Sequence, residues 1–257
     1  MLRANYHTHT YRCKHAEPDE RAYIEHAIRA GIKVLGFSEH APLEFGNGYK
    51  STYRMEVSEI EDYVSTLCTL REEYKKDIEI KIGLEVEYYP EYFESILESI
   101  KGYPFEYFIL GQHFLDNEYE ERIHSASRLE SVPLYEKYVN QLCAGMETGK
   151  FSYLAHPDLF LLRGNEDMFK WGVQKICDKA IQMDMPLEIN FNGAMDDRHY
   201  PSDKFFTEVA KTQCKVIMGV DAHKADMLDD EALYEKCVSL AKRCGITNIV
   251  DEIEYRL

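Results

Sequence analysis

The sequence predicts an α/β fold in which helices cover a parallel β-sheet that is either open or closed into a barrel. Seven short runs rich in β-branched and aromatic residues alternate along the chain with segments of helical periodicity. The runs are mostly apolar on both faces, which is typical of strands that helices cover. Several segments that follow a run are long, and in such folds the loops after the strands build the active site.

The expected elements follow one another in regular order. The strands are expected at 2–7, 33–38, 79–85, 107–111, 152–155, 187–190 and 216–220. The helices are expected at 19–30, 57–74, 92–100, 138–146, 169–181, 203–211 and 231–244, where apolar residues recur every three or four positions. Gly31 ends the first helix. The long loops are expected at 41–56, 114–132, 157–165 and 192–202.

Composition sets limits on the possible functions. The 257 residues, 45% hydrophobic and 30% charged, suit one globular domain spanning 1–257. A net charge of −16 argues against nucleic acid or an anionic membrane as a partner. Seven cysteines without a CxxC pair, no apolar leader and no run of 18 apolar residues lead us to expect a soluble cytoplasmic protein. The oligomeric state is not predicted.

Histidines and carboxylates gather at the carboxyl ends of the expected strands. Six of the seven runs have such a residue at or just past the carboxyl end, and the sixth run has the amides Asn190 and Asn192 there. Buried together without a cation, these groups would be costly, and both are ligands of zinc, manganese and iron. Nine candidate ligands predict a site for two or three ions: His7, His9, His15, His40, Glu85, His113, His156, Asp221 and His223.

Six short motifs together resemble the polymerase and histidinol phosphatase (PHP) family, and within it the histidinol-phosphatase branch. They are HTHT near the start, SEH, GLEVEY, GQHF, AHPD and GVDAH, and they extend from His7 to His223. The resemblance implies a distorted (β/α)7 barrel with three divalent metal ions, zinc foremost and iron or manganese as alternatives. It also implies hydrolysis of L-histidinol phosphate, a small-molecule phosphate monoester, to L-histidinol and phosphate in histidine biosynthesis.

The resemblance also assigns ligands to each ion. His7, His9, Glu85 and Asp221 would hold the first ion. Glu85 would bridge to the second ion, which His113 and His156 would complete. His15, His40 and His223 would hold the third.

Two cations that share Glu85 suggest how the reaction proceeds. They would bridge a water and lower its pKa toward neutrality, and the resulting hydroxide would attack phosphorus in line with the leaving alcohol. Glu85 and Asp221 are therefore counted as catalytic. The charge of the ions also explains how so acidic a protein could bind a phosphate ester.

Other loop residues are candidates for binding substrate and moving protons. Arg163 and Arg198 lie in loops after strands and could bind phosphate, although either could be a solvated surface charge. His199 could give a proton to the leaving oxygen, or could be a spare loop histidine. The same two interpretations apply to His124. Four acids could bind the substrate amine: Glu44, Asp116, Glu118 and Asp158. Glu39 and Glu87 could orient metal ligands.

Three other functions are compatible with part of the pattern. The same centre could serve a different phosphoesterase, such as a phosphotyrosine or nucleotide phosphatase. An amidohydrolase-like metal hydrolase also begins with a His-X-His strand, but such barrels often use a bridging lysine, and no lysine ends a central strand here. A non-catalytic metal-binding module would have no need for nine aligned ligands.

Overall fold

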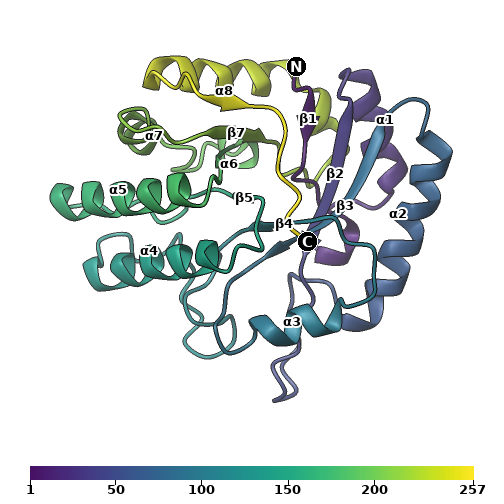
Figure 1. The fold of residues 1–257 in the computed structure, drawn as a ribbon, viewed down its shortest axis with the longest axis horizontal. Coiled ribbons are helices and arrows are strands. Elements are labelled where there is room, and N and C mark those ends of the chain that lie inside the picture. Colours follow the sequence, from purple (N-terminus) through teal and green to yellow (C-terminus); the bar gives the residue numbers. More distant parts are fainter.

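A single parallel sheet forms the centre of the computed structural model, which describes residues 1–257. Its eight strands follow chain order from β1 to β8, and each is hydrogen-bonded to the next. Figure 1 shows the helices arranged around the strands. The strands are β1 (Ala4–Asn5), β2 (Val34–His40), β3 (Glu79–Val86), β4 (Tyr107–Leu110), β5 (Tyr153–Leu154), β6 (Leu187–Asn190), β7 (Val216–Gly219) and β8 (Ile249–Val250). The predicted α/β class is confirmed.

The first seven strands close into a ring at their carboxyl ends. Thr8, just past β1, pairs in parallel with Ala222, just past β7. At the opposite end of β7, Val216 pairs instead with Ile249 of β8. The sheet therefore forms a distorted seven-stranded barrel in which β1 and β7 pair only just past their carboxyl ends, whereas β8 pairs with the other end of β7. We did not expect β8, because two residues, one of them exposed, carry no hydrophobic pattern.

Eight α-helices connect the strands. They are α1 (Glu20–Arg29), α2 (Ile60–Tyr74), α3 (Phe93–Ser99), α4 (Val132–Glu147), α5 (Glu166–Gln182), α6 (Phe191–Met195), α7 (Asp203–Val209) and α8 (Glu231–Cys244), with 3-10 turns at Tyr11–Cys13, Val57–Glu59 and Ala225–Asp229. Seven of the α-helices match expected segments, although α4 begins six residues before its predicted start, with a proline in its first turn. The short α6 lies in a segment that we expected to be a loop.

Local signals in the sequence set several helix ends. The side chain of Asn165 accepts a hydrogen bond from the amide of Met168 and caps the start of α5. Asp230 caps α8 in the same way through the amide of Leu233. Gly245 ends α8 with a φ of 81°, a left-handed conformation that glycine adopts without strain. No helix combines the length and the apolar character needed to cross a lipid bilayer.

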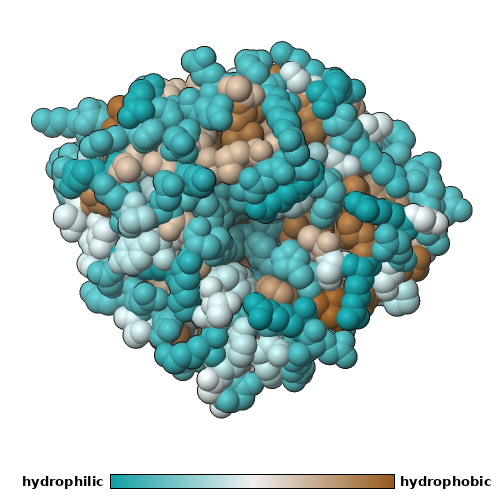
Figure 2. All heavy atoms as spheres, turned by 180° about the vertical axis from the view of Figure 1, so that it is seen from behind, coloured by the Kyte–Doolittle hydropathy of each residue, from teal (hydrophilic) through white to brown (hydrophobic).

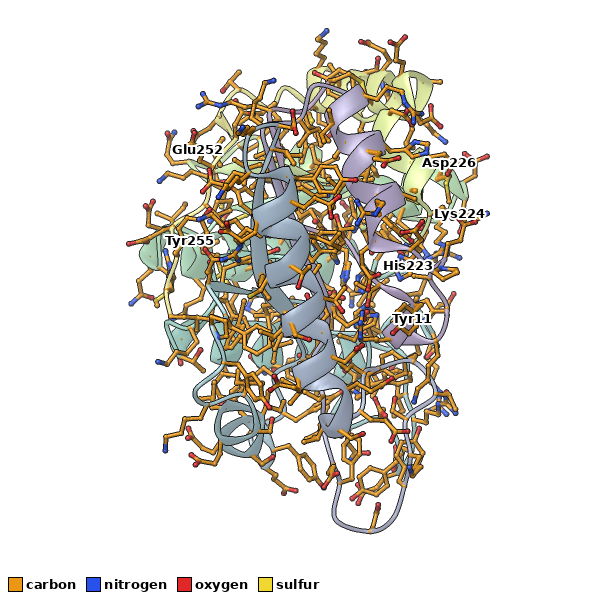
Figure 3. All side chains as sticks on the ribbon, turned by 90° about the vertical axis from the view of Figure 1, so that its right-hand side faces the viewer. Tyr11, His223, Lys224, Asp226, Glu252 and Tyr255 are labelled. Carbon is orange, nitrogen blue, oxygen red and sulfur yellow. The ribbon has the colours of Figure 1, made fainter.

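The chain end closes the face of the barrel opposite the strand carboxyl ends. Tyr255 packs edge-on against Tyr6 and Tyr107, with ring centroids 6.4 Å away in both cases. The Tyr107 hydroxyl donates to the carbonyls of Tyr6 at 2.8 Å and Phe37 at 3.1 Å, so it ties three strands together inside the barrel. Figure 3 shows Tyr255 and His223 on opposite sides of the molecule. The side with His223 is the one at which the predicted ligands lie.

Candidate metal centre

Glu85, at the carboxyl end of β3, lies at the centre of the predicted ligand cluster. Five histidine side chains from four other segments approach its two carboxylate oxygens. The nitrogen-to-oxygen distances are 2.9 Å for His156, 3.0 Å for His40, 3.4 Å for His9, 3.5 Å for His7 and 3.6 Å for His113. The Glu85 side chain is almost fully buried. The residue that resemblance assigns as a bridge between two ions is therefore the one that most ligands surround.

Asp221 provides the second carboxylate of the cluster. Its Oδ1 lies 3.3 Å from His9 Nε2 and 3.5 Å from His7 Nε2. Its Oδ2 accepts hydrogen bonds from the amides of Asn190 at 3.1 Å and Asn192 at 3.2 Å. The two amides at the end of β6 thus fix the orientation of Asp221, and the other oxygen remains directed at the histidines.

His15, His40 and His223 form a separate group at the edge of the cluster. One nitrogen of each lies within 4.8 Å of the others, and His15 Nε2 is 2.9 Å from His223 Nε2. The Nδ1–H of His15 donates to the carbonyl of Cys13 at 2.7 Å, so its Nε2 is the nitrogen left for a metal. The Cys13 thiol also lies within 4.8 Å of ligand atoms of His9 and His223, although the predicted scheme does not use it.

Buried carboxylates lie behind three of the histidines. Glu39 Oε1 lies 3.4 Å from His9 Nδ1, and Glu87 Oε1 lies 3.6 Å from His113 Nδ1. These are the two carboxylates that we expected in this role. A third, Glu188 of β6, accepts a hydrogen bond from His7 Nδ1 at 2.8 Å. We did not expect Glu188 in this position, although a glutamate inside an apolar strand signals a buried charge that needs a partner.

Glu87 is itself held by a buried ion-pair network. Its Oε2 accepts hydrogen bonds from Arg54 and, at 2.7 Å, from the hydroxyl of Tyr53. Arg54 also pairs with Glu118 at 2.6 Å and donates to the carbonyl of Ala41 at 2.8 Å. Arg54 is 2% exposed, so one buried cation compensates two buried carboxylates.

The direction of the pKa shift differs between histidines of the cluster. Burial alone would lower the pKa of His7, but Glu188, Asp221 and Glu85 outweigh it and raise the pKa to about 10. In contrast, burial and the neighbouring His9 lower the pKa of His40 to about 3. Burial would raise the pKa of Glu85, yet the histidines around it hold that pKa well below its ordinary value. The inner cluster therefore has an excess of buried negative charge that a cation would neutralise.

The buried polar atoms show that the residues fit divalent metal ions. His7 Nε2, His9 Nε2 and Asp221 Oδ1 are inaccessible to solvent and have no hydrogen-bond partner. Such orphaned atoms are rare in folded proteins and are costly to bury. All three belong to predicted ligands of the first ion, and imidazole and carboxylate are the donors that zinc, iron and manganese prefer. The histidine and glutamate clusters at this end of the barrel are metal-binding clusters.

A cavity of about 910 Å³ opens above the cluster, and six of the nine predicted ligands line it. Figure 2 shows this face of the molecule, hollowed near its middle and mostly hydrophilic around the hollow. Apart from the ligands, its wall carries three cations, Arg122, Arg198 and Lys224, together with His124, His199 and several aromatic and apolar side chains. The cavity is large enough for a small phosphate ester.

The residues predicted to act on substrate do not all reach this cavity. Arg198 and His199 line it. Arg198 donates to Asp196 at 2.5 Å and to the Tyr200 hydroxyl at 2.9 Å. Arg163 is exposed and is not among the residues that line the cavity. We expected both arginines to bind phosphate because both lie in loops after strands, but only Arg198 lines the cavity.

None of the four acids considered for the substrate amine lines the cavity. Glu118 is paired with Arg54, and Asp158 accepts the amide N–H of Ser202 at 2.6 Å. Apart from Asp221, the only carboxylate on the wall is that of Asp196, just after α6. We did not expect Asp196 there, because nothing local distinguishes it from the chain's other 45 acidic residues.

The chain is similar to the PHP domain family and to proteins named histidinol-phosphatase. The model of the PHP domain family matches residues 5–192. A probable histidinol-phosphatase of Deinococcus radiodurans is 26% identical to this chain, and the alignment covers 85% of each. The histidinol-phosphatase of Bacillus subtilis is also 26% identical, over 92% of this chain and 100% of its own length.

A solved structure has the same fold. It is the histidinol phosphate phosphatase of Lactococcus lactis in complex with zinc, L-histidinol and phosphate. The TM-score is 0.73 over 99% of this chain and 100% of that one, at 19% sequence identity.

Proposed function

The chain belongs to the PHP family, and from that premise we propose that it is a metal-dependent phosphatase that hydrolyses L-histidinol phosphate to L-histidinol and phosphate. The observation that carries the proposal is the convergence of nine histidine and carboxylate side chains at one cavity whose wall also carries three cations. The relatives named histidinol-phosphatase support the choice of substrate. The same relationship would place the reaction in histidine biosynthesis, and the seven free thiols support a cytoplasmic location.

We assign three ions, zinc foremost, to the ligand sets that the family resemblance implies. The first would bind to His7, His9, Glu85 and Asp221, the second to Glu85, His113 and His156, and the third to His15, His40 and His223. Divalent ions bound there would supply positive charge for the phosphoryl oxygens and would lower the pKa of a water toward neutrality.

The protein's own side chains would bind the phosphate and deliver a proton. Arg198 lines the cavity and is held by Asp196 and Tyr200, so its guanidinium is placed to bind phosphoryl oxygens. The Nε2–H of His199 donates to the carbonyl of Leu159 at 2.8 Å, which leaves Nδ1 to carry the proton for the leaving alcohol. Arg163 keeps a proposed role in phosphate binding only if its loop moves toward the cavity.

Asp196 is our candidate for the group that binds the substrate ammonium. It is the one carboxylate of the cavity wall outside the metal cluster. A carboxylate on the wall gives a cationic alcohol an advantage over a neutral one, because the ammonium keeps a charged partner when it leaves water.

A substrate with more negative charge is the second candidate. Three cations on the wall, Arg122, Arg198 and Lys224, would favour a nucleotide or a similar polyanion over histidinol phosphate. The proposed function therefore places a cationic group of the substrate against the wall, whereas this alternative places additional negative charge there.

Phosphate release from a panel of esters tests the proposal. The purified protein would be stripped of metal, restored with zinc, manganese or iron, and assayed with L-histidinol phosphate, phosphotyrosine, nucleoside monophosphates and p-nitrophenyl phosphate. We expect kcat/KM to be at least about tenfold higher for L-histidinol phosphate than for the other esters. An equal or lower value than for p-nitrophenyl phosphate would refute the proposed substrate. Activity in the stripped protein would refute the metal requirement.

A further inference from the structure

We propose that Glu188, a buried carboxylate of β6, positions ligands of two neighbouring metal ions and so sets how tightly the centre holds both. The proposal rests on the metal assignment made above for the proposed function. Strand β6 provides no metal ligand, which made it the exception among the strand ends in the sequence. Its contribution is a positioning residue that acts through the ligands of other strands.

Glu188 accepts hydrogen bonds from two predicted ligands that are far apart in the sequence. Its Oε1 accepts the Nδ1–H of His7, from just past β1, at 2.8 Å. Its Oε2 accepts the backbone N–H of His156, from just past β5, at 3.0 Å. His7 is assigned to the first ion and His156 to the second. One carboxylate therefore fixes the distance between a ligand of each.

A third ligand is linked to Glu188 through an amide. The Nδ2 group of Asn190 donates to Glu188 Oε2 at 2.9 Å and to Asp221 Oδ2 at 3.1 Å. Asp221 follows β7, so β6 connects ligands from the ends of β1, β5 and β7. The amides that the sequence shows at this strand end thus belong to the same positioning network.

The neighbours of Glu188 explain why a carboxylate is needed there. The His7 ring, the His156 backbone and the Asn190 amide all present N–H donors to it, and only a carboxylate accepts all three. A glutamine would turn its own NH₂ group toward one of these donors. By accepting at Nδ1, Glu188 also leaves His7 Nε2 directed at Glu85 and Asp221, 3.5 Å from each.

The barrel makes room for this carboxylate through a glycine. Glu188 is 0% exposed, and it lies against Gly219 of the neighbouring strand. A Cβ added at Gly219 would lie 1.8 Å from Glu188 Oε1, so even alanine would displace the carboxylate. Position 219 therefore offers a way to move Glu188 without changing it.

Glu39 provides a matched comparison, because it has the same arrangement toward a different pair of ligands. Its Oε1 lies 3.4 Å from His9 Nδ1 and accepts the backbone N–H of His40 at 2.8 Å. His9 is assigned to the first ion and His40 to the third. Replacement of Glu39 should therefore weaken binding of the first and third ions, whereas replacement of Glu188 should weaken binding of the first and second.

The test measures metal content and site occupancy in Glu188→Gln, Gly219→Ala and Glu39→Gln. Each variant and the wild type would be loaded with zinc, titrated against a chelator, and crystallised for anomalous diffraction at the zinc edge. Glu188→Gln should bind the first two ions about 10–100-fold more weakly and keep the third. Gly219→Ala should lose the same two ions, and Glu39→Gln should lose the first and third.

The outcomes separate this inference from the proposed function. Glu106→Gln is the control, because Glu106 pairs with Arg71 and Lys81 at the start of β4, away from the centre. Wild-type chelator affinity in both Glu188→Gln and Gly219→Ala would overturn the inference, as would equal loss of all three ions in every variant. A wild type that binds no zinc would instead refute the metal assignment itself. Should Glu188→Gln not fold, the occupancies in Gly219→Ala decide.

Discussion

Thr8 and Ala222 pair through their backbones and close the ring of strands at the end where the metal-binding side chains lie. The amide of His9 donates to the Ala222 carbonyl at 2.9 Å, and the amide of Ala222 donates to the His7 carbonyl at 3.1 Å. Each paired residue is flanked on both sides by predicted ligands. These are His7 and His9 on one strand and Asp221 and His223 on the other. The register of one β-bridge thus sets the spacing of four ligands.

Removal of His15 should empty the third metal site alone. His15 is exposed, and it reaches the cluster from the segment just after the 3-10 turn Tyr11–Cys13 rather than from a barrel strand. Its Nε2 lies 2.9 Å from that of His223, so His15→Ala removes one of three ligands without opening the core. We expect zinc content to fall from three ions per chain to two by mass spectrometry. Three retained ions, or loss of all three, would contradict this assignment. His26→Ala, which changes a histidine paired with Asp229 outside the centre, is the control.

Replacement of Arg54 should destabilise the protein severely. Arg54→Met leaves the carboxylates of Glu87 and Glu118 buried without their cation. Breaking a buried ion pair from one side costs about 3–5 kcal/mol, which urea denaturation of the zinc-loaded protein would measure as a loss of unfolding free energy. Arg21→Met, which removes an exposed ion pair with Glu73, should leave the urea midpoint almost unchanged. Similar midpoints for the two variants would show that the Arg54 network contributes little.

Much of the fold could be predicted because the strands and helices carry local patterns. Strands β2 and β3 are long and apolar, and each ends in ligand motifs that the sequence shows directly. In contrast, β8 is two residues long and depends on its pairing with Val216 of β7. The ring closure by Thr8 and Ala222 joins residues 214 positions apart, so no local pattern could reveal it.

The candidate site also has a part that the sequence predicts and a part that it does not. Eight of the nine predicted ligands stand at or near the end of a strand, where parallel strands bring side chains to one face, and the ninth, His15, follows the 3-10 turn after β1. The part played by Glu188 depends on His7 and His156, which belong to other strands. Asp196 is set apart only by its place on the cavity wall. A role that depends on contacts between distant segments can be recognised only in the folded structure.

His124 should make the metal-free protein less stable in acid. Its Nδ1 accepts the backbone N–H of Ala126 at 3.0 Å, so protonation there would break this bond. Burial, followed by the charge of His113, lowers the pKa of His124 to about 4, whereas it is about 6.5 in an unfolded chain. The unfolded state therefore binds the proton first. The contribution of His124 is fully present above pH of about 6.5 and is lost as the pH falls toward about 4.

The measurement is urea denaturation of metal-free wild type and His124→Gln between pH 7 and pH 4.5. Because glutamine does not titrate, the variant should gain stability relative to the wild type as the pH falls. A difference in unfolding free energy that stays constant over this range would contradict the assigned pKa direction.

Asp196 should determine whether the enzyme prefers a cationic alcohol in its substrate. Asp196→Asn removes the one wall carboxylate outside the metal cluster but keeps the side chain's size. A hydrogen bond to a charged group contributes about 1.5–3 kcal/mol, so kcat/KM for L-histidinol phosphate should fall roughly 10–100-fold. The same constant for p-nitrophenyl phosphate, which has no ammonium, reports any disturbance of the neighbouring Arg198. Asp203→Asn, at an exposed ion pair with Arg243, is the control. An equal fall for both esters would assign Asp196 to holding Arg198, because only a loss confined to the cationic substrate requires direct contact with its ammonium.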